Sequence, residues 1–257
     1  MALPQHSLIG RLLHRRMLAR WRRAAQNAPH AELGALRTQR RQAKQLFTPL
    51  QELSHVAETR LALPRIGSTT FPRPAGTDWS WRPKAWRSAY TQRGIAPAPN
   101  KSSLGDEVTL FHDCPASEVT MVQSRNAGAA DFAPYGVTLE VFHFTGSFLS
   151  LVIEIPPASC TGLQKRHLIQ LALMIDRESP VKVQARLNIK HGPNTEQILM
   201  PLPDDQAETS VEFDLAYSQL NEKRAERMWL DLMFENPKMN KISLRDVNLT
   251  RYPRAEI

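Results

Sequence analysis

The sequence predicts a mainly β protein: a jelly-roll-type antiparallel β-sandwich preceded by a basic α-helical N-terminal arm. Beyond residue 105, apolar and polar residues alternate in about ten short runs separated by turns, which is typical of a sandwich or barrel. The residues before that point are rich in proline, and those nearest the N-terminus show helical periodicity with many arginines. We therefore expect a basic helical arm over 1–62, a Pro-rich, Trp-containing connector over 63–104 and a β-sandwich domain over 105–257.

The arm is predicted to hold three helices. In the first, over 7–26, apolar residues gather on one broad side, although several arginines intrude on it. A second helix is expected over 31–47. The sequence TPLQ then predicts a new helix start, because Thr48 can cap, Pro49 suits the first helical position and Gln51 completes a capping box.

The charge of the chain is concentrated in its front part. The formal net charge is +8, and residues 1–100 hold 17 Lys and Arg against 4 Asp and Glu, whereas residues 101–257 hold 16 against 21. The basic arm could pack on the sandwich or on a second copy, or attach to an anionic membrane surface, or bind nucleic acid. Nucleic acid is the least favoured partner, because no zinc ligands, RNP aromatics or GXXG loop accompany the arginines.

The connector contains three of the five tryptophans. The stretch GTDWSWRPKAWR holds Trp79, Trp81 and Trp86. Trp79 and Trp81 are two positions apart, so they point the same way in an extended segment. The rings could stack on a flat ligand, but we favour their burial against the folded body, because an extended Pro-rich segment gains order by burying large side chains.

The apolar stretches, the N-terminus and the cysteines of the sequence carry no targeting or membrane-spanning signal. No apolar stretch approaches the roughly 20 residues that span a bilayer, and the basic N-terminus does not resemble a secretory signal. The two cysteines, Cys114 and Cys160, lack CxxC spacing and are expected to be reduced. These features predict a cytoplasmic protein, peripheral to a membrane where the arm attaches to one. They define no oligomeric state.

Three of the turns between the predicted strands carry hairpin signals. TG at 145–146, RESP at 177–180 and HGPNTE at 191–196 are each expected to join neighbouring strands of one sheet. The expected strands cover 107–112, 118–123, 136–144, 147–155, 167–176, 181–190, 197–202, 210–217, 228–235 and 241–249.

The alternation of side chains also predicts a candidate binding surface. In the run 181–190 the apolar residues face the core, so Arg186 and Asn188 point outward. The same rule directs Trp229, Asp231 and Glu154 outward from two other strands. If these strands share a sheet, Trp229 could stack on a sugar ring while Arg186, Asn188 and the carboxylates bind its hydroxyls. A solvated face with cross-strand ion pairs also explains the pattern and is the commoner outcome for such residues.

Signals for catalysis are weak. The sequence FHDC at 111–114 brings His112, Asp113 and Cys114 together, and further histidines follow at 143, 167 and 191. An enzyme using Cys114 or a histidine cluster is therefore a third hypothesis. There is no P-loop, GxGxxG, GxSxG or HExxH motif, and we expect no catalytic residue, metal or cofactor.

Seven motifs are specific as a set: TDWSWRP, LFHDC, FTGSFLSLVIEIP, ARLNIKHGPNTEQ, VEFDLAY, WLDLMFENPKMN and LRDVNLTRYPRAE. Together they resemble an uncharacterised bacterial family, a domain of unknown function, and the likeness covers almost the whole chain, including the basic helical front. This resemblance implies no activity, cofactor or site residue. The final run KISLRDVNLTR is also similar to the last strand of galactose-binding-like and carbohydrate-binding jelly rolls. We therefore expect non-catalytic binding of a glycan or glycoconjugate on the sandwich face. The alternative is a scaffold protein that binds another protein and is held on a membrane or partner by its arm.

Overall fold

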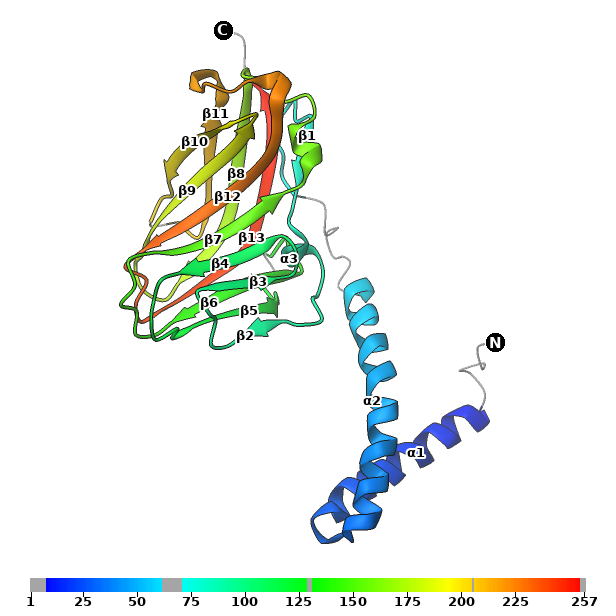
Figure 1. The fold of residues 1–257 in the computed structure, drawn as a ribbon. Helices are drawn as coiled ribbons and strands as arrows, with labels where there is room; N and C mark the ends of the chain where they lie inside the picture. The colour runs from blue at the N-terminus through cyan, green and yellow to red at the C-terminus, as the bar shows by residue number, and fades with distance from the viewer. Residues whose placement is uncertain (1–7, 62–70, 129–130, 205, 255–257) are drawn as a thin grey trace. The chain divides into compact units, whose positions relative to one another are not determined.

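A computed structural model describes residues 8–61, 71–128, 131–204 and 206–254 (Figure 1). The chain divides into two compact units, Met1–Val56 and Ala57–Ile257. The first unit is helical. Its elements are α1 (Leu8–Asn27), a short 3₁₀ turn (Ala28–His30) and α2 (Leu33–Leu61), which continues past the unit boundary. None of the described helices combines the length and apolarity needed to cross a membrane.

The predicted helix start at residue 48 is wrong, because α2 runs unbroken from Leu33 to Leu61 with Pro49 inside it. A proline removes a single N–H from the helical ladder, and the turns on both sides keep their hydrogen bonds. The Thr48 hydroxyl donates to the Lys44 carbonyl, 3.5 Å away, as a hydroxyl within a helix does, rather than capping a new one.

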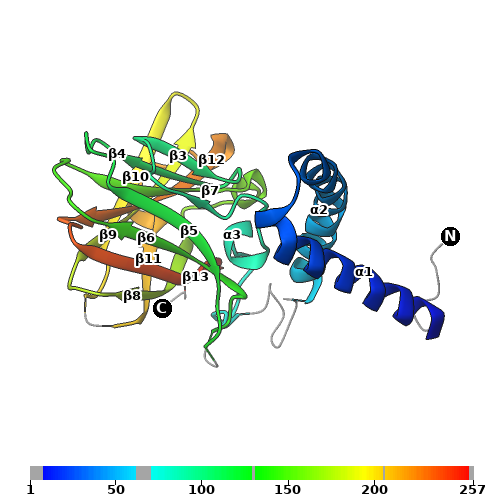
Figure 2. The same cartoon turned by 90° about the horizontal axis from the view of Figure 1, so that it is seen from below.

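The second unit is a sandwich of two antiparallel sheets, which confirms the predicted fold class (Figures 1 and 2). One sheet has the order β11-β8-β13-β6-β5-β2, with β1 also paired to β13, and the other has the order β10-β9-β12-β7-β4-β3. All ten runs predicted as strands are strands. The elements are β1 (Trp79–Trp81), α3 (Lys84–Arg87), β2 (Gly94–Ile95), β3 (Lys101–Leu104), β4 (Val108–His112), β5 (Val119–Arg125), β6 (Tyr135–Val141), β7 (Leu149–Ile155), β8 (His167–Arg177), β9 (Lys182–His191), β10 (Asn194–Pro201), β11 (Glu208–Asp214), β12 (Ala225–Glu235) and β13 (Asn240–Pro253).

Two of the three predicted hairpins are absent. The turn at 145–146 joins β6 to β7, and the turn at 177–180 joins β8 to β9, but the partners belong to different sheets. Both turns therefore carry the chain across the sandwich, and their residue types do not distinguish such a crossing from a hairpin. The turn at 191–196 does form a hairpin, since His191 of β9 pairs with Asn194 of β10.

Alternate side chains fill the space between the sheets. Val181, which precedes β9, and Val183, Ala185, Leu187 and Ile189 of that strand are buried as predicted. The two layers are seen from below in Figure 2, with β3, β4 and β7 in one and β5, β6 and β13 in the other. Because the inner positions are taken by apolar residues, the intervening residues of each strand must face outward.

Residues 71–90, which we call the strap, are held against the sandwich by their aromatic side chains. Trp86 is fully buried, and its Nε1 donates to the Leu244 carbonyl at 2.8 Å. Trp79 and Trp81 flank Ser80 in β1, pack partly buried against the core and stack on each other with centroids 6.5 Å apart. This burial supports the interpretation that the tryptophans hold the segment. Residues 62–70 of the predicted connector lie outside the described residues.

The strap also covers part of the outer face of the seven-stranded sheet. Arg82 donates from Nε and Nη2 to the two oxygens of Asp246 at 2.8 and 2.7 Å, and both side chains are buried. The guanidinium lies 4.9 Å from the ring centroid of Phe71. Asn248 and Thr250, the next outward residues of β13, are buried as well. This ion pair therefore closes the outer face over β13.

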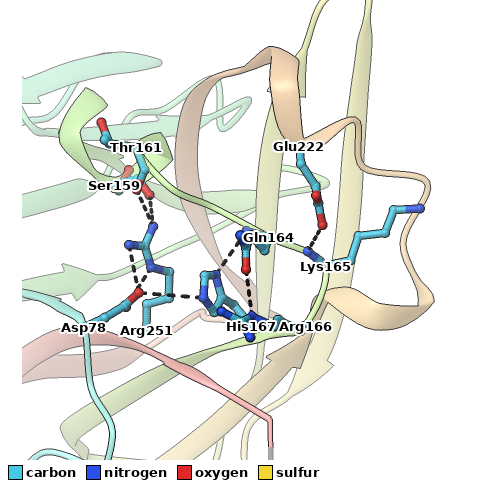
Figure 3. A network of polar contacts seen from close by, with 9 residues as sticks. All are labelled: Asp78, Ser159, Thr161, Gln164, Lys165, Arg166, His167, Glu222 and Arg251. Atoms are coloured by element: carbon cyan, nitrogen blue, oxygen red, sulfur yellow. Dashed lines mark hydrogen bonds and ion pairs between the residues drawn. The ribbon is translucent and has the colours of Figure 1, made fainter.

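A second polar network holds the start of β1 (Figure 3). Arg251 donates to both oxygens of Asp78 at 2.9 and 3.2 Å, and its Nη1 donates to the carbonyls of Ser159 and Thr161. Burial opposes ionisation of Asp78, but the hydrogen bonds and charge of Arg251 outweigh it and lower the pKa of Asp78. His167 lies beside the pair, with Nε2 3.7 Å from Asp78 Oδ2.

We expect Arg82→Met to destabilise the fold by about 3–5 kcal/mol, because it leaves Asp246 buried without its counter-charge. The double variant Arg82→Met/Asp246→Leu removes both charges and should recover most of that loss. Urea denaturation gives the free energy of unfolding of the unmodified chain, the single variant and the double variant. Equal losses in the single and double variants would contradict this role of the ion pair.

Histidine 167 should make stability depend on pH. Burial lowers the pKa of His167 below the ordinary value, and Nδ1 accepts a hydrogen bond from the Gln164 N–H at 3.0 Å (Figure 3). The unfolded chain therefore binds the proton first. The contribution of His167 is complete above about pH 6.5 and is lost as the pH falls towards its folded pKa.

His167→Asn keeps an acceptor for Gln164 and cannot be protonated in this range. We expect the free energy of unfolding to fall less for this variant than for the unmodified chain between about pH 7 and about pH 5. Parallel pH profiles of the two proteins would show that His167 does not carry the effect.

Candidate functional site

The outer face of the six-stranded sheet brings side chains from four strands together in cross-strand rows. One row, the Arg186 row, contains Arg186 of β9, Asp231 of β12 and Val152 of β7. The next row, the Met233 row, contains Gln184 of β9, Met233 of β12, Ser150 of β7 and Phe111 of β4. Neighbours in a row lie directly opposite across the sheet, so their side chains share one surface.

A groove of about 540 Å³ follows these two rows. Its lining is partly apolar, through Phe111, Val152 and Met233, and partly polar, through Gln184, Arg186 and Asp231. Phe148, which directly precedes β7, completes the lining and is 48% exposed. Apolar surface beside a few fixed polar groups is the usual composition of a small-molecule site.

The central polar feature of the groove is the pair of Arg186 and Asp231. Arg186 donates from Nε and Nη2 to one carboxylate oxygen, Oδ2, at 2.9 and 2.6 Å. Asn188 Nδ2 lies 3.1 Å from the same oxygen. Asn188 is itself fixed by Gln197, whose Nε2 donates to Asn188 Oδ1 at 3.0 Å. The donors thus hold Asp231 in one orientation.

This arrangement leaves one donor and one acceptor at the groove. Within the described residues the hydrogen bonds of the pair use Asp231 Oδ2 and two of the three guanidinium nitrogens. Arg186 Nη1 can therefore donate a hydrogen bond to a ligand, whereas the Asp231 side chain is only 5% exposed and Oδ1 could accept only from a group that enters the groove closely. The Arg186 side chain is 36% exposed, which puts this donor within reach of a bound molecule.

A short loop before β7 positions Phe148. Asp113 accepts hydrogen bonds from the N–H groups of Ser147 and Phe148 at 2.7 and 3.2 Å, and from the Ser147 hydroxyl at 2.5 Å. The hydrogen bond from the Ser147 side chain is the main cause that lowers the pKa of Asp113. Gly146 permits the close approach, since a Cβ there would lie 2.4 Å from Asp113 Oδ1 and 2.8 Å from the Cys114 nitrogen.

The five residues predicted as a binding site do lie on one face, and they fall into two groups. Arg186 and Asp231 line the groove. Asn188, Trp229 and Glu154 form the adjacent row, in which Trp229 is opposite both of the others. In this row Glu154 forms an ion pair with Arg227, whose guanidinium lies 4.9 Å from the centroid of the Trp229 ring. Hydrogen bonding to Glu154 raises the pKa of Arg227.

Part of the groove was outside the predicted site. Phe111 and Met233 follow the same alternation as the predicted residues, so a complete list of outward positions would have included them. Phe148 lies just before its strand, and the contact of its loop with Asp113 joins positions more than thirty residues apart. No local sequence pattern signals that contact.

The geometry gives no support to the hypothesis of a cysteine or histidine centre. Both ring nitrogens of His112 are engaged by the backbone: Nδ1 accepts from the Cys114 N–H at 3.2 Å, and Nε2 lies 3.0 Å from the Ala98 carbonyl. Cys114 is buried; burial opposes ionisation, but hydrogen bonds from residues 145–146 and 116 outweigh it and lower the pKa of the thiol. The described residues contain no group of three or more His, Cys, Asp or Glu side chains placed to hold a metal ion.

The other sheet offers a smaller hollow of about 330 Å³ on its outer face. It is lined partly by Gln170, Glu208, Asn248 and the buried Asp246. Asp246 is already bound on both oxygens by Arg82. The groove on the six-stranded sheet, which keeps a donor and an acceptor for a ligand, is therefore the stronger candidate.

The second unit is thus an antiparallel β-sandwich with a partly apolar groove on one outer face. The whole chain, residues 1–257, matches the model of a family of unknown function, DUF6478, and belongs to that family. The comparison with curated proteins found no match.

Among solved structures, the chain is similar to the enzymatically active domain of tailspike protein 4 from bacteriophage CBA120, with 12% identity and a TM-score of 0.40 over 60% of this chain and 22% of the tailspike chain. It is also similar to the family 11 carbohydrate-binding module of Clostridium thermocellum, with 11% identity and a TM-score of 0.39 over 64% and 97% of the two chains. A third match is the C-terminal family 22 module of Clostridium thermocellum Xyn10B, with 8% identity and a TM-score of 0.36 over 73% and 99%.

We expect Gly146→Ala to destabilise the loop before β7, because the new methyl group overlaps Asp113 and the backbone of Cys114. Overpacking of this kind costs about 1–3 kcal/mol and should lower the melting temperature by about 2–4 °C per kcal/mol. Gly34→Ala is the matched control, since nothing lies within 4 Å of the added atom in α2. Equal melting temperatures for the two variants would contradict the close approach.

Proposed function

We propose that this protein binds carbohydrate in the groove on the outer face of the six-stranded sheet, with Phe148, Arg186 and Asp231 as the principal contacts. The observation that supports it most is the position of an exposed aromatic ring and an oriented donor–acceptor pair on the lining of one groove. A sugar ring needs both features, because it has an apolar face of C–H groups and a rim of hydroxyls that donate and accept.

The charges of the groove favour a neutral ligand over a strongly anionic one. Arg186 is the positive group among its lining residues; it pairs with Asp231, and the lining also contains the carboxylate of Glu235. Gln184 Nε2 donates to Glu235 Oε1 at 2.6 Å, which holds that carboxylate at the edge of the groove. A phosphate or sulfate would meet these carboxylates at close range, whereas hydroxyl groups can donate to them.

The volume is also suited to a short oligosaccharide. Ligand sites commonly occupy about 300–1,000 Å³, and the groove has about 540 Å³. The Arg186 row and the Met233 row extend across strands β4, β7, β12 and β9, so a chain of sugar units could lie across the strands.

The competing interpretation is a solvated face stabilised by cross-strand pairs. Glu154 with Arg227, and Arg186 with Asp231, are pairs of that kind. This interpretation explains the row of Trp229 well, because Arg227 covers that ring. It does not explain the exposed ring of Phe148 or the loop that holds it.

We expect Phe148→Ala to weaken binding on an array of neutral oligosaccharides by about tenfold or more, because it removes the aromatic surface of the groove. Phe142→Ala is the matched control: its ring is 49% exposed against 48% for Phe148, but it is not part of the groove lining. Isothermal titration with a sugar identified on the array gives the dissociation constants.

Asp231→Asn should also weaken binding, since it exchanges the fixed carboxylate for an amide. A loss of binding in Trp229→Ala with no change in Phe148→Ala would move the site to the row of Trp229, Asn188 and Glu154. Absence of binding by the unmodified chain to any array sugar would overturn the proposal.

A further inference from the structure

The helical unit carries the whole net charge of the chain. Residues 1–56 hold ten Lys and Arg against two Asp and Glu, which equals the formal charge of +8 of the full sequence. Residues 57–257 hold 23 of each sign. A partner attracted by charge would therefore be anionic and would bind the helical unit.

Helix α2 exposes a stripe of large apolar side chains. Leu46, Phe47, Leu50 and Leu53 follow the i, i+1, i+4, i+7 spacing of one helix face. All four are exposed, with Phe47, Leu50 and Leu53 at 63%, 58% and 65%. Exposed leucines scattered singly need no partner, but a contiguous stripe at helical spacing is typical of an interaction surface.

Helix α1 adds cations without any acidic residue. Its sequence LIGRLLHRRMLARWRRAAQN contains six arginines and no Asp or Glu. Leu13, Met17 and Leu18 are exposed between these arginines. Long arginine side chains can keep their charge in water or at a headgroup while their stems cover apolar surface. Both helices thus combine positive charge with uncovered apolar side chains.

Three kinds of partner could cover such a surface, and the charges discriminate between them. A second copy would bring another basic helical unit of the same charge against this one, with only Glu32 and Glu52 to oppose the repulsion. Nucleic acid would satisfy the arginines but leave the apolar stripe in water. A bilayer surface with anionic lipids satisfies both, since its headgroups attract the arginines and its acyl boundary accepts the apolar side chains.

We propose that α1 and α2 bind the surface of an anionic lipid bilayer, with Leu46, Phe47, Leu50 and Leu53 entering the acyl boundary and the arginines of α1 contacting headgroups. This binding is independent of the carbohydrate groove. It would hold the protein at a membrane while the sandwich keeps its own ligand, and each activity can be lost without the other.

The test is co-sedimentation of the full chain with vesicles of phosphatidylcholine alone and of phosphatidylcholine with about one third phosphatidylglycerol. We expect binding to the mixed vesicles and at least tenfold weaker binding to the neutral ones. Raising the salt from about 0.1 M to about 0.5 M should release most of the protein, because screening weakens the arginine contacts.

Leu50→Ser tests the apolar contact, and Leu33→Ser is its matched control. Leu33 is exposed on the same helix, at 72%, but lies 13 residues before the first residue of the stripe, about 20 Å away along the axis. We expect Leu50→Ser to weaken vesicle binding by about tenfold and Leu33→Ser to leave it unchanged. Far-UV circular dichroism should show equal helix content in the two variants.

Several results would overturn the proposal. Equal binding to neutral and anionic vesicles would remove the role of the arginines, and equal losses in Leu50→Ser and Leu33→Ser would remove the role of the stripe. Light scattering that shows a dimer in the unmodified chain and a monomer in Leu50→Ser would assign the stripe to a second copy. Salt-sensitive binding to duplex DNA or RNA, with none to vesicles, would assign the arginines to nucleic acid.

Discussion

Alternate apolar side chains fill the space between the two sheets, and this packing decides what the outer faces can display. On β12, for example, Leu230, Leu232 and Phe234 are buried between the sheets, so Trp229, Asp231 and Met233 must point outward. A shift of one residue in register would bury Asp231 against the apolar core and expose three large apolar residues, which is prohibitively unfavourable. The packing of the core therefore determines which side chains line the groove.

The two outer faces are not equivalent, because the strap lies on only one of them. Arg82 and Phe71 close the seven-stranded sheet over β13, and the acceptors of Asp246 are used in that closure. On the six-stranded sheet the corresponding buried acid, Asp231, is paired with an arginine of the neighbouring strand, which leaves its surroundings open. Both sheets contain an Arg–Asp pair on the outer face, but one pair binds a segment of the chain itself and the other lines the groove.

The sequence was sufficient for properties that depend on periodicity. The ten strands, the inward residues of β9 and the outward direction of all five candidate residues follow from alternation alone. The order of the strands does not, since β7, β12 and β9 are neighbours in the sheet but are separated along the chain by other strands. That order brings Glu154 of β7 next to Trp229 and Arg227, which share strand β12.

The predictions from sequence were wrong where a local sequence pattern is compatible with more than one structure. Thr48 and Pro49 carry the signature of a helix start, yet the helix continues through them. The turns at 145–146 and 177–180 have hairpin composition but join different sheets. In each case the decision depends on what packs against the flanking segments, and a short stretch of sequence does not contain that information.

Under the two proposals, the two units recognise their partners through different physical interactions. In the sandwich, positive and negative residues balance, and the groove pairs its arginine with a carboxylate, so binding there rests on hydrogen bonds and ring contact. In the helical unit ten Lys and Arg outnumber two Asp and Glu, and α1 contains no carboxylate to neutralise its arginines. Long-range electrostatic attraction would therefore act on the helical unit, and selectivity through short-range contacts would come from the six-stranded sheet. Because screening weakens the first kind of interaction and hardly affects the second, salt concentration should separate the two proposed activities in a single intact chain.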